Sequence, residues 1–240
     1  MKKIISLILA VLMLMSVLSV SVLAANEPRE ITVADGSVTS CSMPVYGSYS
    51  DQYQLNQCIY PASMFSDYGT ITKMTFYTRT SQKEWPGATY CVALEEVTEE
   101  AFADKFLDYY NSKIVYEGEF SVKDNKMTIE FQTPYNYKRG NLLLTVYTKT
   151  PAEKWGNCDF FGINSKDASR RNCNKEGVSS TRYIAGTDFI PKTTFTFSDG
   201  TAESASTFGE GSGWVIAGIG GVVIIGGLAA MVVAKRKKKE

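Results

Sequence analysis

The sequence predicts an all-β domain in which two sheets pack face to face, and three observations support this prediction. Short runs rich in β-branched and aromatic residues recur through the middle of the chain, separated by Gly, Pro and Asn, which is the composition of strands and their turns. In residues 127–131, apolar and polar side chains alternate strictly, as in a strand with one buried and one solvated face. Many short strands joined by loops favour a sandwich of two sheets.

The predicted strands follow one another between the two ends of the chain. The clearest patterns lie at residues 71–79, 89–97, 114–121, 126–132, 142–149, 158–163, 181–185 and 193–198. Weaker patterns lie at residues 30–34, 43–46 and 57–60. Loop residues between these runs mark where each strand is expected to end.

One segment, residues 98–110, breaks the strand pattern and predicts a short helix. Thr98 stands where an N-cap is expected, and Glu99 and Glu100 fall in the first turn. Phe102 and Phe106 are four residues apart and would share one face of the helix. We expect this helix to cross a connection between strands and to pack its aromatic face on the sandwich.

The N-terminal residues 1–24 have the pattern of a secretory signal peptide. Lys2 and Lys3 precede an uncharged apolar stretch, which ends in small residues before Ala25. The apolar stretch is longer than most signal cores, so an uncleaved anchor is the alternative. Either way, we expect residues 25–198 to form the domain on the far side of the membrane.

The C-terminal part predicts a membrane anchor. Residues 214–234 are uncharged and apolar over the length that a helix needs to cross a bilayer. The basic residues of the tail, 235–240, resist translocation and are expected to stay in the cytoplasm. Residues 199–213 are small, polar and rich in Gly and Ser, which is typical of a flexible stalk. The sequence therefore predicts a single-pass cell-membrane protein with an extracellular N-terminal domain.

Small residues recur every four positions at the start of this apolar stretch, at Gly213, Ala217 and Gly221. Such spacing allows two helices to approach closely in lipid, so a weak homo-oligomer could form through this face. The alternative is that glycine is simply tolerated in a membrane span.

The composition excludes several classes of function. The chain has no histidine, which removes Ser-His-Asp and Cys-His catalysis and histidine-based zinc sites. Once the basic residues of the two ends are set aside, residues 25–198 are mildly acidic, so nucleic acid is a poor partner. We predict no catalytic residue and no cofactor. A carboxylate pair for glycoside hydrolysis is the enzymatic alternative, because carboxylate spacing is invisible in sequence.

The acidic residues are expected to be solvated rather than catalytic. The densest group consists of Glu95, Glu96, Glu99, Glu100 and Asp104. Loop aspartates could supply oxygen ligands to calcium, but none of them forms the D-x-D-x-D-G spacing of a calcium loop. No metal site is therefore predicted.

The five cysteines, Cys41, Cys58, Cys91, Cys158 and Cys173, include no C-x-x-C pair. An odd number leaves at least one thiol unpaired in a secreted domain. Cys158 and Cys173 flank a polar loop and are the pair that could be bridged.

Loop aromatics are the candidate ligand-binding residues. Trp85 and Trp155 each stand in a polar loop after a long strand, and Tyr46, Tyr49 and Tyr53 crowd a third loop-rich stretch. Aromatic faces among polar residues can stack on sugar rings or anchor a protein partner. The alternative is that these rings close the open ends of the sandwich.

An ordered series of short motifs resembles a module found in secreted and surface proteins of gut and oral anaerobic bacteria. The series is Met43-Pro-Val-Tyr-Gly, Ile59-Tyr-Pro-Ala-Ser, Ile71-Thr-Lys-Met-Thr-Phe-Tyr, Thr133-Pro-Tyr with Gly140-Asn-Leu-Leu-Leu, and Pro191-Lys-Thr-Thr-Phe-Thr-Phe. The resemblance covers about residues 38–198 and implies a jelly-roll-like sandwich of adhesin-like type. It carries no catalytic motif. A cell-surface module that binds a glycan or a protein is therefore the first hypothesis, and a structural surface protein or the extracellular arm of a membrane complex is its rival.

Overall fold

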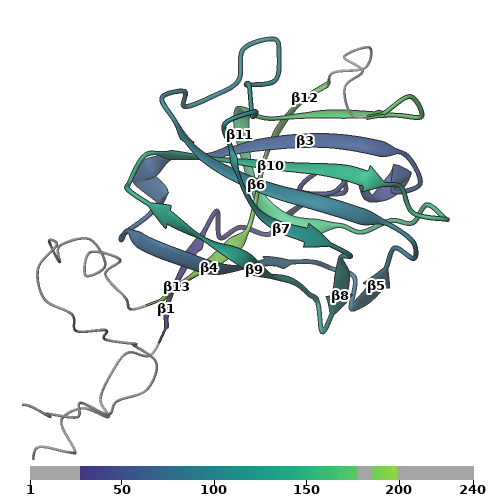
Figure 1. The fold of residues 1–240 in the computed structure, drawn as a ribbon, viewed down its shortest axis with the longest axis horizontal. Coiled ribbons are helices and arrows are strands. Elements are labelled where there is room, and N and C mark those ends of the chain that lie inside the picture. Colours follow the sequence, from purple (N-terminus) through teal and green to yellow (C-terminus); the bar gives the residue numbers. More distant parts are fainter. Residues whose placement is uncertain (1–27, 178–184, 199–240) are drawn as a thin grey trace, which may run out of the picture. The chain divides into compact units, whose positions relative to one another are not determined.

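The computed structural model describes residues 28–177 and 185–198, which form two antiparallel sheets with almost no helix (Figure 1). The segments predicted to be a signal peptide, a stalk, a membrane helix and a basic tail, with Gly213, Ala217 and Gly221, lie outside the described residues. Within the described ranges, no helix is long and apolar enough to span a bilayer. Two short 3-10 turns, Gly47–Tyr49 and Ala62–Met64, interrupt the loops.

The first sheet has six strands in the order β1-β13-β4-β9-β8-β5. Every pairing is antiparallel, and β1 at the start of the domain pairs with β13 at its end. The strands are β1 (Arg29–Val33), β4 (Gly69–Tyr77), β5 (Gln82–Glu84), β8 (Ser121–Lys123), β9 (Lys126–Tyr137) and β13 (Thr193–Ser198).

The second sheet has seven strands, with β12-β11-β3-β10-β6-β7 in order and β2 paired to the start of β11. Figure 1 shows β3, β10, β6 and β7 side by side in one layer, and β13, β4 and β9 in the other. The strands are β2 (Val38–Ser40), β3 (Tyr53–Tyr60), β6 (Thr89–Val97), β7 (Lys113–Gly118), β10 (Asn141–Thr150), β11 (Phe160–Asn174) and β12 (Ala185–Pro191).

The main core lies between the two sheets and follows the two-residue period of the strands. In β10, Leu142 and Leu144 belong to this core, whereas Leu143 between them joins a smaller cluster with Ile59 and Phe102. The second sheet is therefore buried on both sides near β3 and β10. The larger core gathers aromatic rings from both sheets, and its largest fully buried side chains include Trp85, Tyr60, Tyr90, Tyr137, Phe76, Phe160, Phe195 and Phe197.

Most predicted strands are present, but their ends shift. The predictions at 89–97 and 193–198 coincide with β6 and β13. The prediction at 114–121 spans two strands, because β7 ends at Gly118 and β8 begins at Ser121. The predictions at 126–132 and 158–163 cover only the first parts of β9 and β11. Of residues 181–185, only Ala185 is described, and it begins β12.

The strand predicted at residues 43–46 is absent, and a series of bends occupies this position. Met43 and Val45 are fully buried. The apolar residues here are thus buried as in a strand, but their backbone is not extended into one. The peptide bond before Pro44 is cis. Pro44 also has no N–H to donate to a sheet, and its carbonyl accepts a hydrogen bond from the Asn56 side chain (3.0 Å) instead.

The helix predicted at residues 98–110 is wrong. This stretch belongs to an irregular connection between β6 and β7, residues 98–112, which we call the β6–β7 connection (Figure 1). Two of its backbone amides bond to the sheet: Phe102 N–H donates to the Asp167 carbonyl (2.8 Å), and Leu107 N–H donates to Gln57 Oε1 (2.9 Å). Phe102 is nevertheless buried against the sheet, so the expected packing of this aromatic side chain is confirmed.

At one residue, the edge of the second sheet is bonded to a side chain from the first. Gln132 of β9 accepts a hydrogen bond from Glu117 N–H (3.0 Å) and donates one from its Nε2 to the Glu117 carbonyl (2.8 Å). Glu117 lies in β7, which is the last strand of its sheet. The amide of Gln132 therefore makes both hydrogen bonds that a further strand would make at this residue.

Candidate functional site

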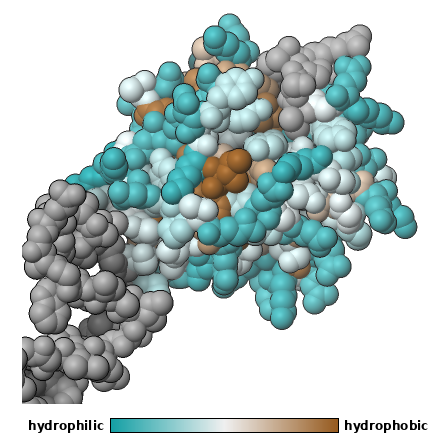
Figure 2. Space-filling view, viewed as in Figure 1, coloured by the Kyte–Doolittle hydropathy of each residue, from teal (hydrophilic) through white to brown (hydrophobic). Residues whose placement is uncertain are grey.

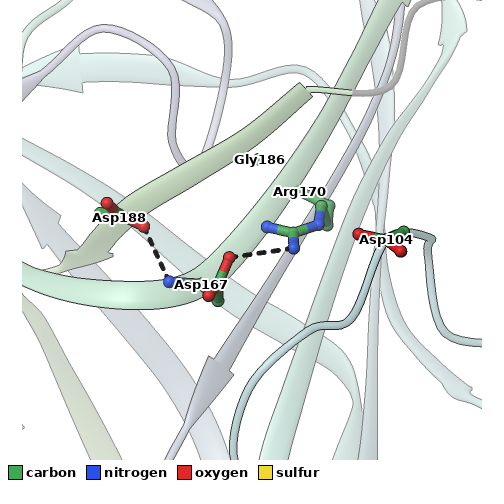
Figure 3. A pocket seen from close by; sticks show the side chains of 5 residues that line it. All are labelled: Asp104, Asp167, Arg170, Gly186 and Asp188. Atoms are coloured by element: carbon green, nitrogen blue, oxygen red, sulfur yellow. Dashed lines mark hydrogen bonds and ion pairs between the residues drawn. The ribbon is translucent and has the colours of Figure 1, made fainter.

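A polar surface pocket of about 360 Å³ lies where β11, β12 and the β6–β7 connection meet (Figure 3). Figure 3 shows the guanidinium of Arg170 between Asp167 on one side and Asp104 on the other. Gly186 and Asp188 of β12 complete the lining. The pocket lining thus contains three acidic residues and one arginine.

Arg170 is buried, and its donors are directed mainly at main-chain carbonyls. Nε donates to Ala103 (3.0 Å), and Nη2 donates to Phe102 (3.2 Å) and also to Ala103. Nη2 further pairs with the Asp167 carboxylate (3.2 Å). A buried charge is stable only when it is paired and hydrogen-bonded. Arg170 therefore holds the β6–β7 connection onto β11.

The acidic residues of the pocket are also engaged in the fold. Asp167 has a left-handed backbone conformation, with φ of 53°, and its N–H donates to Asp188 Oδ1 (2.8 Å). A Cβ at Gly186 would lie 2.5 Å from Arg170 Nη1, so a larger residue at this position would force the guanidinium to shift. Within the described ranges, no group of three or more His, Cys, Asp or Glu side chains could hold a metal ion. The residues of this pocket thus serve to anchor the β6–β7 connection to β11.

The β6–β7 connection is fixed at further points along its length. Asn141 Nδ2 donates to the Glu99 carbonyl (3.0 Å), and Gln57 bonds both the N–H and the carbonyl of Leu107 (2.9 and 3.0 Å). Near its end, the Ser112 hydroxyl donates to Glu95 Oε2 (2.7 Å). Side chains of the sheet thus replace the internal hydrogen bonds that a helix would have had.

Trp85 is a core residue, which corrects the prediction that it contacts a ligand. Its side chain is 1% exposed, and its ring meets Tyr90 edge to face with centroids 6.4 Å apart. Tyr90 in turn stacks on Phe120 at 4.4 Å. The Trp85 ring therefore belongs to the main core and not to the exposed surface.

Trp155 and Tyr49 remain at the surface, 63% and 46% exposed. They belong to two loops, residues 46–52 and 151–159, which we call the aromatic loop pair. Ala152 N–H donates to the Ser50 carbonyl (3.1 Å), which joins the two loops through their backbones.

A side-chain hydrogen bond joins the same two loops, because Ser48 Oγ donates to Asn157 Oδ1 (2.8 Å). The ring of Tyr46 lies 5.0 Å from that of Tyr49 and carries the Arg171 guanidinium 4.1 Å from its centroid. Tyr53, at the start of β3, is half-buried. The structure thus brings Tyr46 and Tyr49 into contact on a loop that is bonded to the loop of Trp155.

A second group of aromatic residues was not predicted from the sequence. Tyr110 is 89% exposed and stacks on Tyr109, with ring centroids 5.8 Å apart and planes inclined by 15°. Tyr109 also lies 5.9 Å from Tyr147 of β10. We call Tyr109, Tyr110 and Tyr147 the tyrosine cluster. The adjacent tyrosines are visible in the sequence, but their contact with Tyr147 arises only from the strand order.

Charged groups lie beside the tyrosine cluster. In the register of the sheet, Tyr147 is opposite Cys91, and Cys91 is opposite Glu117. Glu117 pairs with Lys149 (2.6 Å), and this contact is the main cause that holds the pKa of the Glu117 carboxyl below its usual value. On the other side, Asp108 Oδ1 accepts a hydrogen bond from Tyr110 N–H (2.9 Å).

All five cysteines are free thiols, so Cys158 and Cys173 are not joined. Burial raises the pKa of both thiols to about 11. A thiol acts as a nucleophile only after it has lost its proton. These two side chains are therefore unsuited to nucleophilic chemistry near neutral pH.

The hydrophobic surface on the face drawn in Figure 2 consists of small separate areas among hydrophilic residues. A large contiguous apolar patch would indicate a protein or membrane contact. The face in Figure 2 shows no such patch among the described residues.

The fold and these surfaces define a β-sandwich-like, all-β domain with exposed aromatic side chains on fixed loops. No protein-family model and no curated protein matches the chain. The resemblance to bacterial surface modules therefore stays a prediction.

Proposed function

We propose that this chain is a non-catalytic binding module on the outer face of a bacterial cell membrane, where it recognises a glycan or a protein. In this proposal, residues 1–24 direct secretion, residues 214–234 anchor the chain, and residues 199–213 hold the domain away from the lipid. The sandwich is jelly-roll-like, as the resemblance to adhesin-like modules implies. The ligand contacts the aromatic loop pair.

The observation that carries the proposal is the exposure of Trp155 on a loop that is held in place. Its side chain is 63% exposed, although tryptophan is normally among the more buried residue types. Rigid, partly exposed aromatic rings supply much of the binding energy at recognition surfaces. Hydrogen bonds from residues 46–52 fix the loop, so little conformational entropy is lost when a ligand binds.

A glycan array tests the proposal, with the soluble fragment 25–198 as the probe. This fragment contains every described strand, from β1 to β13. If a glycan is bound, Trp155→Ala should weaken binding at least about fivefold, because truncating a central aromatic contact costs more than about 1 kcal/mol. The matched control is Tyr68→Ala, since Tyr68 is 52% exposed but lies outside the loop pair.

A second arm tests protein ligands. Cell-surface proteins are passed over the immobilised fragment and over its Trp155→Ala variant, and retained proteins are compared. If neither arm shows a ligand, the rival interpretation as a structural surface protein is favoured. If a ligand binds equally well to Trp155→Ala, the aromatic loop pair is not the site.

A further inference from the structure

The tyrosine cluster has a geometry suited to one kind of ligand. Tyr110 is 89% exposed and stacks on Tyr109, which contacts Tyr147. Single exposed apolar side chains are common on protein surfaces and need no explanation. Three aromatic rings in successive contact, one of them almost fully in water, form instead a surface on which another flat molecule can stack.

The cluster is held in position before any ligand arrives. Tyr109 and Tyr110 lie on the β6–β7 connection between two fixed points, Leu107 bonded to Gln57 and Ser112 bonded to Glu95. Tyr147 lies within β10, a central strand of the sheet. A surface whose backbone is already fixed loses little freedom on binding.

The polar groups beside the rings match the edge of a sugar. A pyranose ring combines an apolar face of C–H groups with a rim of hydroxyls, so it needs an aromatic surface with hydrogen-bonding groups next to it. Asp108 is bonded to the backbone N–H of Tyr110. On the neighbouring strands, Cys91 is opposite Tyr147 on one side and opposite Glu117, which pairs with Lys149, on the other. Both carboxylates can accept hydrogen bonds from hydroxyls. The charge of Glu117 is balanced by Lys149, so it is Asp108 that would repel a carboxylated or sulfated sugar.

We propose that the tyrosine cluster is a stacking platform for the sugar rings of an uncharged polysaccharide. The tyrosine cluster is a separate surface from the aromatic loop pair. The proposal names an uncharged polysaccharide, whereas the proposed function names only a glycan or a protein. The inference does not require that the aromatic loop pair binds a ligand.

The test uses the full chain, purified in detergent micelles, in pull-down and affinity gel electrophoresis. The probes are the uncharged polysaccharides cellulose, xylan, mannan and starch, and the acidic polysaccharides polygalacturonate and hyaluronan. The wild-type chain should bind at least one uncharged polysaccharide. Tyr110→Ala should weaken this binding at least about fivefold, as expected for loss of a central aromatic contact, whereas Tyr110→Phe should retain it within about twofold because the ring remains.

Two control variants show whether binding depends on the tyrosine cluster in particular. Tyr68→Ala removes an exposed tyrosine elsewhere and should leave binding unchanged. Trp155→Ala tests the proposed function independently. If Trp155→Ala loses binding and Tyr110→Ala does not, the inference about the tyrosine cluster is overturned, but the proposed function is not. Retention of acidic polysaccharides only, or of none, would also overturn it. Because Tyr110 is almost fully exposed, the melting temperature of Tyr110→Ala should equal that of the wild type.

Discussion

Two buried tyrosines offer a matched test of the hydrogen bonding in this core. Tyr60 and Tyr90 are 0% and 1% exposed. The Tyr60 hydroxyl lies 2.7 Å from Thr193 Oγ1, whereas the Tyr90 hydroxyl has no hydrogen-bond partner within residues 28–177 and 185–198. Replacing each tyrosine with phenylalanine removes one oxygen atom and keeps the ring.

The expected effects on the free energy of unfolding differ in sign. Thr193 Oγ1 donates its proton to the Pro191 carbonyl (3.0 Å), so Tyr60 must be the donor in its contact with Thr193. Tyr60→Phe removes this hydrogen bond and should lower the free energy of unfolding by about 1 kcal/mol. Tyr90→Phe removes a buried hydroxyl whose loss of hydration is uncompensated, so it should leave the free energy unchanged or raise it by about 1 kcal/mol.

The packing of the Tyr90 ring should survive the substitution. Its stacking on Phe120, at 4.4 Å with planes 4° apart, and its edge contact with Trp85 involve the ring alone. Any change in stability can therefore be assigned to the hydroxyl. This distinction makes the comparison sharper than truncation to alanine, which would also leave a cavity.

Urea unfolding of fragment 25–198 at pH 7, followed by tryptophan fluorescence and circular dichroism, measures both variants. An unchanged dependence on urea would show that the unfolded states are comparable. In thermal unfolding, Tyr60→Phe should melt about 2–4 °C below the wild type, the shift expected per kcal/mol for a domain of this size. If Tyr90→Phe is destabilised as much as Tyr60→Phe, the reasoning is refuted, because the Tyr90 hydroxyl must then have a partner.

Three further predictions concern the thiols, the anchored connection and the membrane topology. Burial raises the pKa of Cys158 from 9.0 to about 11, so as the pH rises the thiol loses its proton first in the unfolded chain. The free energy of unfolding should therefore fall between about pH 9 and pH 11. Urea titrations across this range should show a shallower fall for Cys158→Ala. Arg170→Lys keeps a charge beside Asp167 but loses the guanidinium that bonds the Phe102 and Ala103 carbonyls. It should therefore destabilise the domain by about 1–3 kcal/mol and speed hydrogen exchange at the Phe102 amide. Protease added to intact cells should cut residues 199–213 and release the domain, as the basic tail predicts.

Each of these predictions has a result that would count against it. A pH profile of the Cys158→Ala variant that matches the wild type would assign the alkaline loss of stability to other groups. Unchanged exchange at Phe102 in Arg170→Lys would show that Arg170 does not hold the β6–β7 connection. A domain that is protected on intact cells, with an accessible tail, would reverse the predicted orientation.

The alternation of residue types predicted most strands, because burial on one face of a sheet leaves a local pattern. The pattern works best in β6 and β13, which are rich in β-branched and aromatic residues. It fails in β11, whose second part, residues 164–174, is rich in polar and charged residues. These residues are placed in a strand by pairing with β3 and β12, and such partners are not visible in a single sequence.

The helix prediction at residues 98–110 failed for the same physical reason. Local propensity favoured helical hydrogen bonds, but Gln57 and Arg170 bind the backbone of this segment. Both side chains come from distant parts of the chain, and their contributions exceed the small differences in helix propensity. Tertiary contacts therefore decided the local conformation.

The two candidate tryptophans show why the site was only partly predictable. Trp85 follows Lys-Glu and Trp155 follows Glu-Lys, and both stand before loop residues, so their local sequences are nearly equivalent. One is buried and the other is exposed. Burial depends on which segments cover each ring, whereas the local sequence reports only that a loop is present.

The bond between Gln132 and β7 has a consequence for contacts between molecules. An uncovered strand at the edge of a sheet can pair with the same strand of another molecule and start aggregation. At Glu117 both backbone groups are already bonded to Gln132 (3.0 and 2.8 Å), so a neighbouring chain finds neither a donor nor an acceptor there. Copies of the domain at high concentration could therefore lie edge to edge at this residue without exchanging strands.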